Sequence, residues 1–226
     1  MDERRLVLEK IDKYGVDVYQ DPKLFKFGLD AVCLAEFAKN YARNKKNYVD
    51  MCSGTGIVGI LLSKMLNIED PIFVEINPYF VEVNSLNLRH NSLDARVINT
   101  DIKYLDRYIA EGTVDFISIN PPYMKANHGL KTRDKFIDLA KIEGDDNFLE
   151  DFFKIAFYLL KDKGQVFMVH RVERLVDIFS LARAIKMEPK TIQYIRNKNA
   201  SKASLVLIRF VKNGGRFLEN LNDYII

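Results

Sequence analysis

The sequence has few of the residues that build disulfide frameworks or metal sites. Its only cysteines are Cys33 and Cys52, and its three histidines are scattered along the chain. Without a C-x-x-C pair, neither a disulfide framework nor a structural zinc site is expected, and we predict no bound metal. Free thiols are typical of proteins in the reducing cytoplasm, which is the predicted location.

Long apolar runs are also absent. No stretch approaches the roughly 20 consecutive apolar residues that a helix needs to cross a bilayer. The amino terminus, Met1 to Arg5, has no apolar segment behind it, so no secretory signal is expected. These absences argue against a membrane protein and against a secreted one.

What is present is an ordinary globular composition of 226 residues, 48% hydrophobic and 29% charged. This length supports one domain with a sizeable core. No internal repeat, low-complexity run or Pro/Gly/Ser-rich linker divides the chain, so we expect a single domain over 1–226. Within it, an N-terminal segment over 1–45, opened by a helix from Asp2 to Lys13, precedes a core over 46–226.

Strand and helix patterns alternate along that core. A helix capped by Asp30 and running to Tyr41 precedes it. The predicted strands are 47–51, 72–74, 96–98, 114–119, 165–169, 191–195 and 204–211, and the predicted helices are 56–66, 78–90, 148–160 and 175–185. Nearly continuous apolar strands separated by helices imply a mostly parallel, seven-stranded sheet covered on both faces. The last two strands are joined by a short link, which predicts an antiparallel hairpin at one end of the sheet.

Acidic residues follow three successive predicted strands, at Asp50, Glu75 and Asp101. Ligands of open sheets bind at the carboxyl ends of strands. After Asp50, Gly54 and Gly56 let the backbone turn sharply and lie against a ligand. Asp50 would repel a phosphate but suits a cationic sulfonium or ammonium. Glu75 is placed to accept hydrogen bonds from two ribose hydroxyls, and Asp101 to hold an adenine amino group.

Each of these acids has a simpler interpretation as a helix cap, which applies most readily to Asp101. Cys52, in the same glycine-containing turn, is interpreted as a small packing residue rather than a nucleophile, because no histidine is placed beside it.

The tetrapeptide Asn120-Pro121-Pro122-Tyr123 follows the strand predicted over 114–119. The two prolines rigidify the loop and remove two backbone donors, which leaves the carbonyls outward. The Asn120 side-chain oxygen and the Pro121 carbonyl can then accept from one –NH2 group and orient its lone pair, while Tyr123 stacks on a planar group. This favours catalysis by positioning and electrostatic stabilisation, without a strong general base.

Asp50 through Gly56, Glu75, Asp101 and the tetrapeptide resemble the motifs of the Rossmann-like class I methyltransferases. The tetrapeptide itself is similar to that of the amino methyltransferases, which act on adenine N6, cytosine N4, guanine N2 or protein glutamine. Over most of the chain, the resemblance extends to the tRNA1(Val) (adenine-37-N6)-methyltransferase family. It is carried by residues 23–34, 50–58 and 120–123, with weaker patterns at 139–143 and 169–175.

The resemblance implies a Rossmann-like fold, S-adenosylmethionine as cofactor and an adenine of the tRNA anticodon loop as substrate. It implies that Phe27–Asp30 closes over the cofactor and the target base. The predicted cofactor-binding residues are Phe27, Asp30, Asp50, Cys52, Gly54, Gly56, Glu75, Ile76, Asp101, Ile102 and Asn120. The predicted catalytic residues are Asn120, Pro121, Pro122 and Tyr123.

The final part of the chain is basic: residues 161–216 contain thirteen Lys and Arg against four acids. A basic region on a nearly neutral protein predicts contact with a phosphate backbone, and the alternative is that these charges are solvated on ordinary helix faces. The segment 125–147 is interpreted as a lid that contacts tRNA, or else as a solvated loop. The predicted RNA-binding residues are Lys125, Arg133, Arg171, Arg174, Lys198 and Lys202.

Three other functions stay open at this point. A protein glutamine N5-methyltransferase uses the same tetrapeptide, but such enzymes usually carry a separate amino-terminal helical domain, and only a short segment precedes Asp50. A guanine N2 RNA methyltransferase and a non-catalytic RNA-binding relative are the others. A sequence-specific DNA methyltransferase is disfavoured, because no extra domain is available to read a duplex. We expect a monomer that binds tRNA and no membrane.

Overall fold

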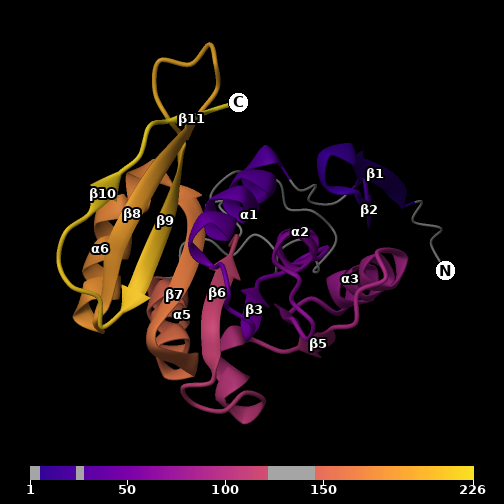
Figure 1. The fold of residues 1–226 in the computed structure, drawn as a ribbon, viewed down its shortest axis with the longest axis horizontal. Coiled ribbons are helices and arrows are strands. Elements are labelled where there is room, and N and C mark those ends of the chain that lie inside the picture. The colour runs from indigo at the N-terminus through magenta and orange to yellow at the C-terminus, as the bar shows by residue number, and fades with distance from the viewer. Residues whose placement is uncertain (1–5, 24–27, 122–145) are drawn as a thin grey trace.

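The computed structural model describes residues 6–23, 28–121 and 146–226. Within these ranges a nine-stranded sheet forms the centre, with helices on both faces (Figure 1). Its strands are β3 (Tyr48–Met51), β4 (Ile72–Glu75), β5 (Arg96–Asn99), β6 (Val114–Ile119), β7 (Leu160–Arg171), β8 (Met187–Arg196), β9 (Leu205–Lys212), β10 (Glu219–Asn220) and β11 (Tyr224–Ile225). The strand order is β10-β8-β9-β7-β6-β3-β4-β5, and β11 also pairs with β8.

The directions of these strands confirm a mostly parallel sheet with an antiparallel hairpin near one end. β5, β4, β3, β6 and β7 run parallel, whereas β9 runs antiparallel to both β7 and β8. β8 therefore points the same way as β7, and the carboxyl ends of six strands share one edge. The sheet exceeds the seven predicted strands because β10 and β11 add to the edge of β8, and two residues each are too few to show a strand pattern.

The helices divide between the two faces. They are α1 (Leu29–Tyr41), α2 (Ile57–Leu66), α3 (Pro78–His90), α5 (Asp146–Leu159) and α6 (Leu175–Ala184), with short 3-10 turns η1 (Asp12–Tyr14), η2 (Ile102–Arg107) and η3 (Val172–Arg174). α1, α2 and α3 lie on one side of the sheet, and α5 and α6 on the other (Figure 1). None of these described helices is long and apolar enough to cross a membrane.

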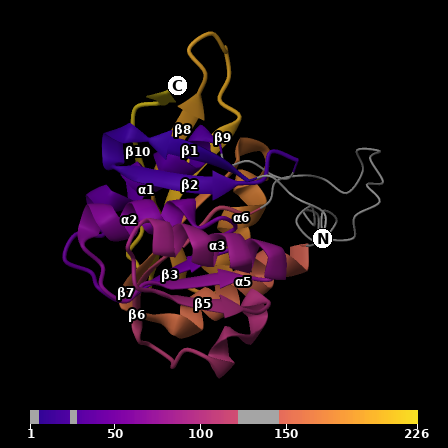
Figure 2. The ribbon, with the colours of Figure 1, turned by 90° about the vertical axis from the view of Figure 1, so that its right-hand side faces the viewer.

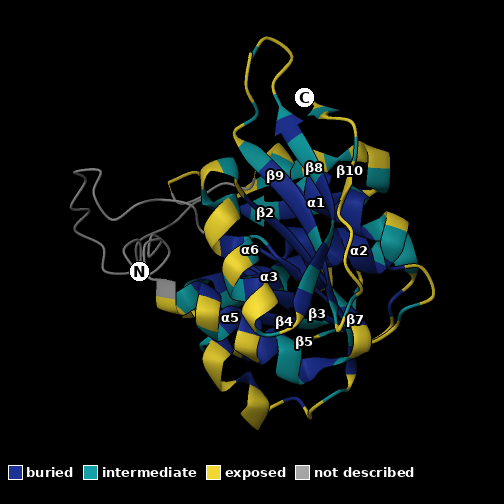
Figure 3. Cartoon of the chain, turned by 90° about the vertical axis from the view of Figure 1, so that its left-hand side faces the viewer, coloured by how far each residue is buried: buried dark blue, intermediate teal, exposed yellow. Residues whose placement is uncertain are grey.

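The strands between these layers are buried on both faces (Figure 3). All four residues of β3 are buried: Val49 and Met51 belong to the core under α5, and Tyr48 to the core under α1 and α2. Each fully buried large apolar side chain contributes about 1.5–3 kcal/mol relative to exposure. This two-sided burial explains why the strands are continuously apolar in sequence. A strand with one solvent-exposed face would instead alternate apolar and polar residues.

The N-terminal segment differs from the prediction. Instead of a helix from Asp2 to Lys13, its described residues form β1 (Val7–Ile11), which pairs antiparallel with β2 (Val16–Gln20). Gly15, at φ 59°, makes the turn before β2. Val16 and Val18 of β2 are fully buried, whereas β1 has no fully buried residue. Packing of β2 therefore decides the structure, and β1 follows as its strand partner. The hairpin lies over α2 and α3 (Figure 2).

Two further boundaries need correction. β7 has 12 residues where five were predicted, because it pairs with β6 on one side and with β9 as far as Arg171 on the other. β8 has 10 residues where five were predicted, because it pairs with β9 from Met187 to Ile195.

Candidate active site

The predicted site residues that the structure describes gather at the carboxyl edge of the sheet. In the strand register Met51 lies beside Val74 and Ile119, and Glu75 beside Asn99. Cys52, Ile76, Asp101 and Asn120 follow directly after these positions, so four separate segments meet at one edge. Pro122, Tyr123, Phe27, Lys125 and Arg133 lie outside the described residues, and their roles stay predictions.

The turn after β3 has an unusual backbone. Cys52, Gly54 and Gly56 have φ values of 55°, 52° and 89°, and the Gly56 N–H donates to the Ser53 carbonyl at 2.8 Å. A Cβ at Gly54 would meet nothing within 4 Å, so the space beside this residue is open. A Cβ at Gly56 would lie 2.7 Å from Oδ1 of Asn84. We call residues 53–56 the cofactor loop.

The half-buried Cys52 is protonated at neutral pH. Burial, followed by the nearby Glu75 and Asp50 carboxylates, raises the pKa of its thiol well above the usual value. A protonated thiol is a poor nucleophile. This agrees with the interpretation of Cys52 as a packing residue.

Asp50 faces the protein rather than the open edge. Its side chain is 1% exposed, Oδ2 accepts from the Gly59 N–H at 3.1 Å, and Oδ1 accepts from the Ser118 hydroxyl. Burial raises the pKa of this carboxyl to about 7. A Cβ at Gly59 would lie 2.2 Å from the Phe73 ring, so glycine there lets α2 pack directly against β4. The described contacts make Asp50 an anchor beneath the loop; contact with a cofactor stays a prediction.

Glu75 joins the cofactor loop to α3. Its Oε2 accepts from the Gly54 N–H and its Oε1 from the Asn77 N–H, both at 2.9 Å. Burial raises the pKa of the carboxyl, and hydrogen bonds from the backbone N–H groups of Asn77, Gly54 and Ile76 oppose that rise. A carboxylate offers about four lone-pair positions, so one remains beyond these three donors, and acceptance from ribose hydroxyls stays a prediction. Ile76, next in the chain, is 45% exposed.

Asp101 and Ile102 make contacts within the protein. The Asp101 carboxylate accepts from the Lys103 N–H at 3.2 Å as the cap of η2, and also pairs with the Lys103 ammonium at 3.1 Å. The Asp101 carboxylate therefore acts as the cap of η2, and its contact with an adenine amino group stays a prediction. The Ile102 side chain is only 6% exposed and packs in the core under α5.

The most informative contact joins Asn120, after β6, to Asp30 at the start of α1. Asn120 Nδ2 donates to Asp30 Oδ2 at 3.3 Å. Because a carboxylate can only accept, Nδ2 must face Asp30, and the amide presents Oδ1 as its acceptor end. Asp30 is not the helix cap that was predicted: α1 begins at Leu29 with Gly28 as cap, where a Cβ would lie 2.4 Å from Asp30 Oδ1. The first turn of α1 thus positions Asp30 against Asn120.

The four described residues with predicted RNA contacts lie at this same edge. Arg171 ends β7 and pairs with Glu173 at 3.3 Å, and Arg174 ends η3 and pairs with Asp177 at 3.0 Å. Lys198 and Lys202 are exposed on the link between β8 and β9, which extends beyond the sheet in Figure 1.

Sequence reasoning missed several buried polar residues near the site. His170, at the end of β7, is 2% exposed, and burial lowers its pKa to about 4, so its ring is neutral. Asn84 and Asn87 of α3, and Asn91, which caps the end of that helix, are also buried. The available signal was their spacing, which repeats an amide on one helical face among apolar residues.

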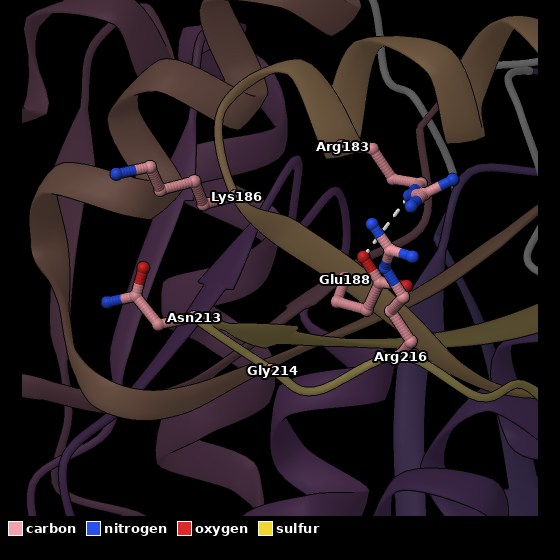
Figure 4. A pocket seen from close by; sticks show the side chains of 6 residues that line it. All are labelled: Arg183, Lys186, Glu188, Asn213, Gly214 and Arg216. Atoms are coloured by element: carbon pink, nitrogen blue, oxygen red, sulfur yellow. Dashed lines mark hydrogen bonds and ion pairs between the residues drawn. The ribbon is translucent and has the colours of Figure 1, made fainter.

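A hollow of about 500 Å³ lies elsewhere (Figure 4). It is lined by Arg183, Lys186, Glu188, Asn213, Gly214 and Arg216, and Arg183 pairs with Glu188 at 3.2 Å. These residues surround the start of β8 and the end of β9, at the edge opposite Asn120. The hollow is separate from the candidate site. Nowhere in 6–23, 28–121 or 146–226 do three or more His, Cys, Asp or Glu gather as a metal site would require.

Comparisons with known proteins agree with this architecture. The family model described as "Methyltransferase small domain" matches residues 30–177. A solved structure of a predicted O-methyltransferase, Atu636 from Agrobacterium tumefaciens, has a TM-score of 0.65 and 18% identity over 87% of this chain and 86% of that one. TYW2 from P. horikoshii in complex with MeSAdo has a TM-score of 0.66 and 15% identity over 95% and 74% of the two chains.

TrmN from Thermus thermophilus has a TM-score of 0.55 and 20% identity over 80% of this chain, which spans 48% of that one. At such identities the likeness concerns the fold. Among curated proteins, no sequence matches this chain.

Proposed function

Because this chain belongs to the methyltransferase small domain family, whose fold uses S-adenosylmethionine, we propose that it methylates the N6 amino group of an adenine in tRNA. The specific target we propose is adenine 37 in the anticodon loop of tRNA1(Val). Methyl transfer by an enzyme of this fold is the premise; the adenine, its position and the RNA are the proposal.

The contact between Asp30 and Asn120 is the observation that carries the choice of an amino group. Asp30 turns the amide so that Oδ1 is its acceptor end. Oδ1 and the adjacent Pro121 carbonyl form two acceptors, which match the two hydrogens of an –NH2 group, whereas a hydroxyl has one. Positive charge develops on the nitrogen during transfer, and two fixed acceptor dipoles stabilise it.

The cofactor site proposed here uses residues that fit an adenosyl group. The loop at Gly54 leaves open space, Glu75 keeps one acceptor position beyond its three backbone donors, and exposed Ile76 offers an apolar surface beside it. S-adenosylmethionine supplies an electrophilic methyl group when bound. The protein's part is to hold the acceptor nitrogen in line with that methyl group and to exclude water.

Charge at the same edge favours an RNA substrate. Lys198 and Lys202 are exposed beyond the ends of the strands, and Arg171 lies between them and Asn120 in the sheet order. Arg196 Nη1 donates to the Ala200 carbonyl at 3.0 Å, which holds the link carrying both lysines. A base in an anticodon loop is unpaired, so it can enter such a site at lower cost than a base in a duplex.

The test is methyl transfer from labelled S-adenosylmethionine to bulk tRNA or to release factor, followed by nuclease digestion and mass spectrometry. We expect label in tRNA as N6-methyladenosine, and its loss on Asn120→Ala. The matched variant Asp30→Asn leaves the orientation of the Asn120 amide unspecified, so kcat should fall about tenfold, the rate equivalent of one hydrogen bond.

Other outcomes name other functions. N2-methylguanosine in tRNA would overturn the choice of adenine. Label in release factor alone would indicate a glutamine N5-methyltransferase, and tRNA binding without label in either substrate would indicate a non-catalytic RNA-binding relative.

A further inference from the structure

Three buried asparagines line one face of α3. Asn84, Asn87 and Asn91 are 0%, 0% and 7% exposed, and their spacing of three and four residues places them in one row. A buried amide is costly unless its donors and acceptors are bonded. In Figure 2, α3 lies next to the hairpin of β1 and β2, and the partners of these amides show how the hairpin and the cofactor loop are joined.

Two of these amides act toward β2 as a neighbouring strand would. Asn87 Oδ1 accepts from the Tyr19 N–H at 2.7 Å, and its Nδ2 donates to the Tyr19 carbonyl at 3.0 Å. Asn91 repeats the pattern at Asp17, accepting at 3.4 Å and donating at 2.6 Å. Asn87 and Asn91 are four residues apart, which is a rise of about 6 Å along a helix. Tyr19 and Asp17 are two residues apart, which is about 6.8 Å along a strand, so the two spacings match.

The same row holds the cofactor loop from the other side. The second hydrogen of Asn87 Nδ2 is donated to the Thr55 carbonyl at 2.9 Å. Asn84 Nδ2 donates to Ser53 Oγ at 3.0 Å, and its side chain packs where Gly56 lacks a Cβ. Asn84 thus contacts the loop, Asn91 contacts the hairpin, and Asn87 contacts both with one amide.

We propose that Asn87 is a positioning residue that couples the N-terminal hairpin to cofactor binding at the loop. A ligand that restrains residues 53–56 restrains the Thr55 carbonyl, and through the Asn87 amide it restrains the backbone of Tyr19. By linkage, a well-ordered hairpin strengthens cofactor binding by the same factor. The proposal rests on the cofactor site proposed above, and not on the identity of the methyl acceptor.

The hairpin has attachments that do not involve Asn87. Val16 and Val18 are buried in the core, and Lys13 and Tyr14 both donate to the Glu36 carboxylate of α1. The Asp21 carboxylate accepts from the Tyr79 hydroxyl at 2.9 Å. The hairpin therefore stays folded when the Asn87 amide is changed, and the coupling can be tested apart from folding.

The experiment measures hydrogen exchange at the amides of Asp17 and Tyr19, with and without saturating S-adenosylmethionine, together with the cofactor Kd by calorimetry. The main variant is Asn87→Asp, which keeps the volume and the acceptor for the Tyr19 N–H but lacks the amide hydrogens. Asn91→Ala is the matched control on the hairpin side, and Asn84→Ala on the loop side.

In the wild type, we expect cofactor to slow exchange at Tyr19 several-fold. In Asn87→Asp, the Kd should rise about fivefold, the equivalent of about one hydrogen bond, and the cofactor should no longer slow exchange at Tyr19. Asn91→Ala should speed exchange at Asp17 and raise the Kd less than Asn87→Asp does, and it should retain the cofactor effect at Tyr19. Asn84→Ala should weaken binding yet retain that effect. If Asn87→Asp does not fold, a wild-type protein in which bound cofactor leaves exchange at Tyr19 unchanged still overturns the coupling.

Cofactor protection of Tyr19 that is unchanged in Asn87→Asp would overturn the coupling. So would Asn91→Ala weakening cofactor binding as much as Asn87→Asp, because the hairpin alone would then set affinity. A wild-type protein that does not bind S-adenosylmethionine would overturn the proposed function as well.

Discussion

The two halves of the sheet are built differently. In 50–118, which contains β4, β5, half of β3 and most of β6, ten buried side chains are polar, among them Asp50, Glu75 and Asn87. In the described residues 146–226, the only buried polar side chains are those of His170 and Thr191. β3, β4 and β5 have four residues each, whereas β7 and β8 have 12 and 10.

This difference teaches where rigidity comes from in each half. Short strands end early, so loops must be held by buried amides and carboxylates, each with directional partners. Long strands pair along their length and need only apolar packing. The half with short strands, 50–118, therefore holds polar groups in fixed positions where a cofactor can bind. The half 146–226 forms a stable part of the sheet, with cationic side chains exposed at the ends of its strands. The two halves should respond differently to substitution.

The largest effect is expected at the boundary between the halves, in Asn120→Ala. This change removes the acceptor that orients the amino group, so kcat should fall about 10²–10³-fold. Single-turnover methyl transfer would measure it, with calorimetry showing that S-adenosylmethionine still binds. Retention of wild-type kcat would contradict the role assigned to Asn120.

Asp50 should make the stability of the protein depend on pH. Its pKa is about 7 in the folded state and about 3.9 when unfolded. The folded state therefore binds a proton that the unfolded state lacks between these values, and the free energy of unfolding falls as pH rises from about 4 to 7. The difference between these two pKa values corresponds to about 4 kcal/mol of unfolding free energy as an upper limit.

Urea unfolding at several pH values would measure this slope, and Asp50→Asn should flatten it. Glu75, whose pKa is also raised by burial, contributes a slope of the same sign. The variant should therefore keep a smaller slope, and an unchanged one would show that Asp50 does not titrate in this window.

Gly59→Ala should destabilise the half with short strands by overpacking. The new Cβ would lie 2.2 Å from the Phe73 ring, and overpacking of this kind costs about 1–3 kcal/mol. The matched control is Gly112→Ala, where φ is 64° but no atom lies within 4 Å. It should cost only the backbone strain of about 1 kcal/mol. A Gly59→Ala variant that keeps wild-type stability in urea unfolding would show that packing at Gly59 is unimportant.

The smallest effect is expected in the half with long strands, at its exposed cations. Lys198→Ala with Lys202→Ala should weaken tRNA binding and make it less dependent on salt, with the slope of log Kd against log salt concentration falling by about one for each phosphate that a lysine contacts. The Kd for S-adenosylmethionine should not change. The control is Lys186→Asn at the opposite edge, since asparagine tolerates the left-handed φ of 63° there. If Lys186→Asn weakens tRNA binding as much as the double lysine variant does, tRNA does not bind preferentially at the carboxyl edge of the sheet.

Much of this molecule could be predicted from local patterns. α3 over Pro78–His90 and β6 over Val114–Ile119 match their predicted bounds, because each has a clear apolar period and a turn signal at its ends. The meeting of Cys52, Glu75, Asp101 and Asn120 at one edge followed from a parallel sheet alone. The orientation of Asp50 could not be predicted, since the sequence does not show which face of a strand end a carboxylate takes.

The sequence by itself determined the alternation of strands and helices and the chemistry of the strand ends, because period, glycine and proline act over a few residues. Only the tertiary structure decided that Val7–Ile11 forms a strand where a helix was predicted, that Asp30 turns the Asn120 amide, and that Asn87 joins Tyr19 to Thr55. Each of these depends on partners distant along the chain. A buried polar group takes its role from the atom it meets, and that atom is known only once the chain has folded.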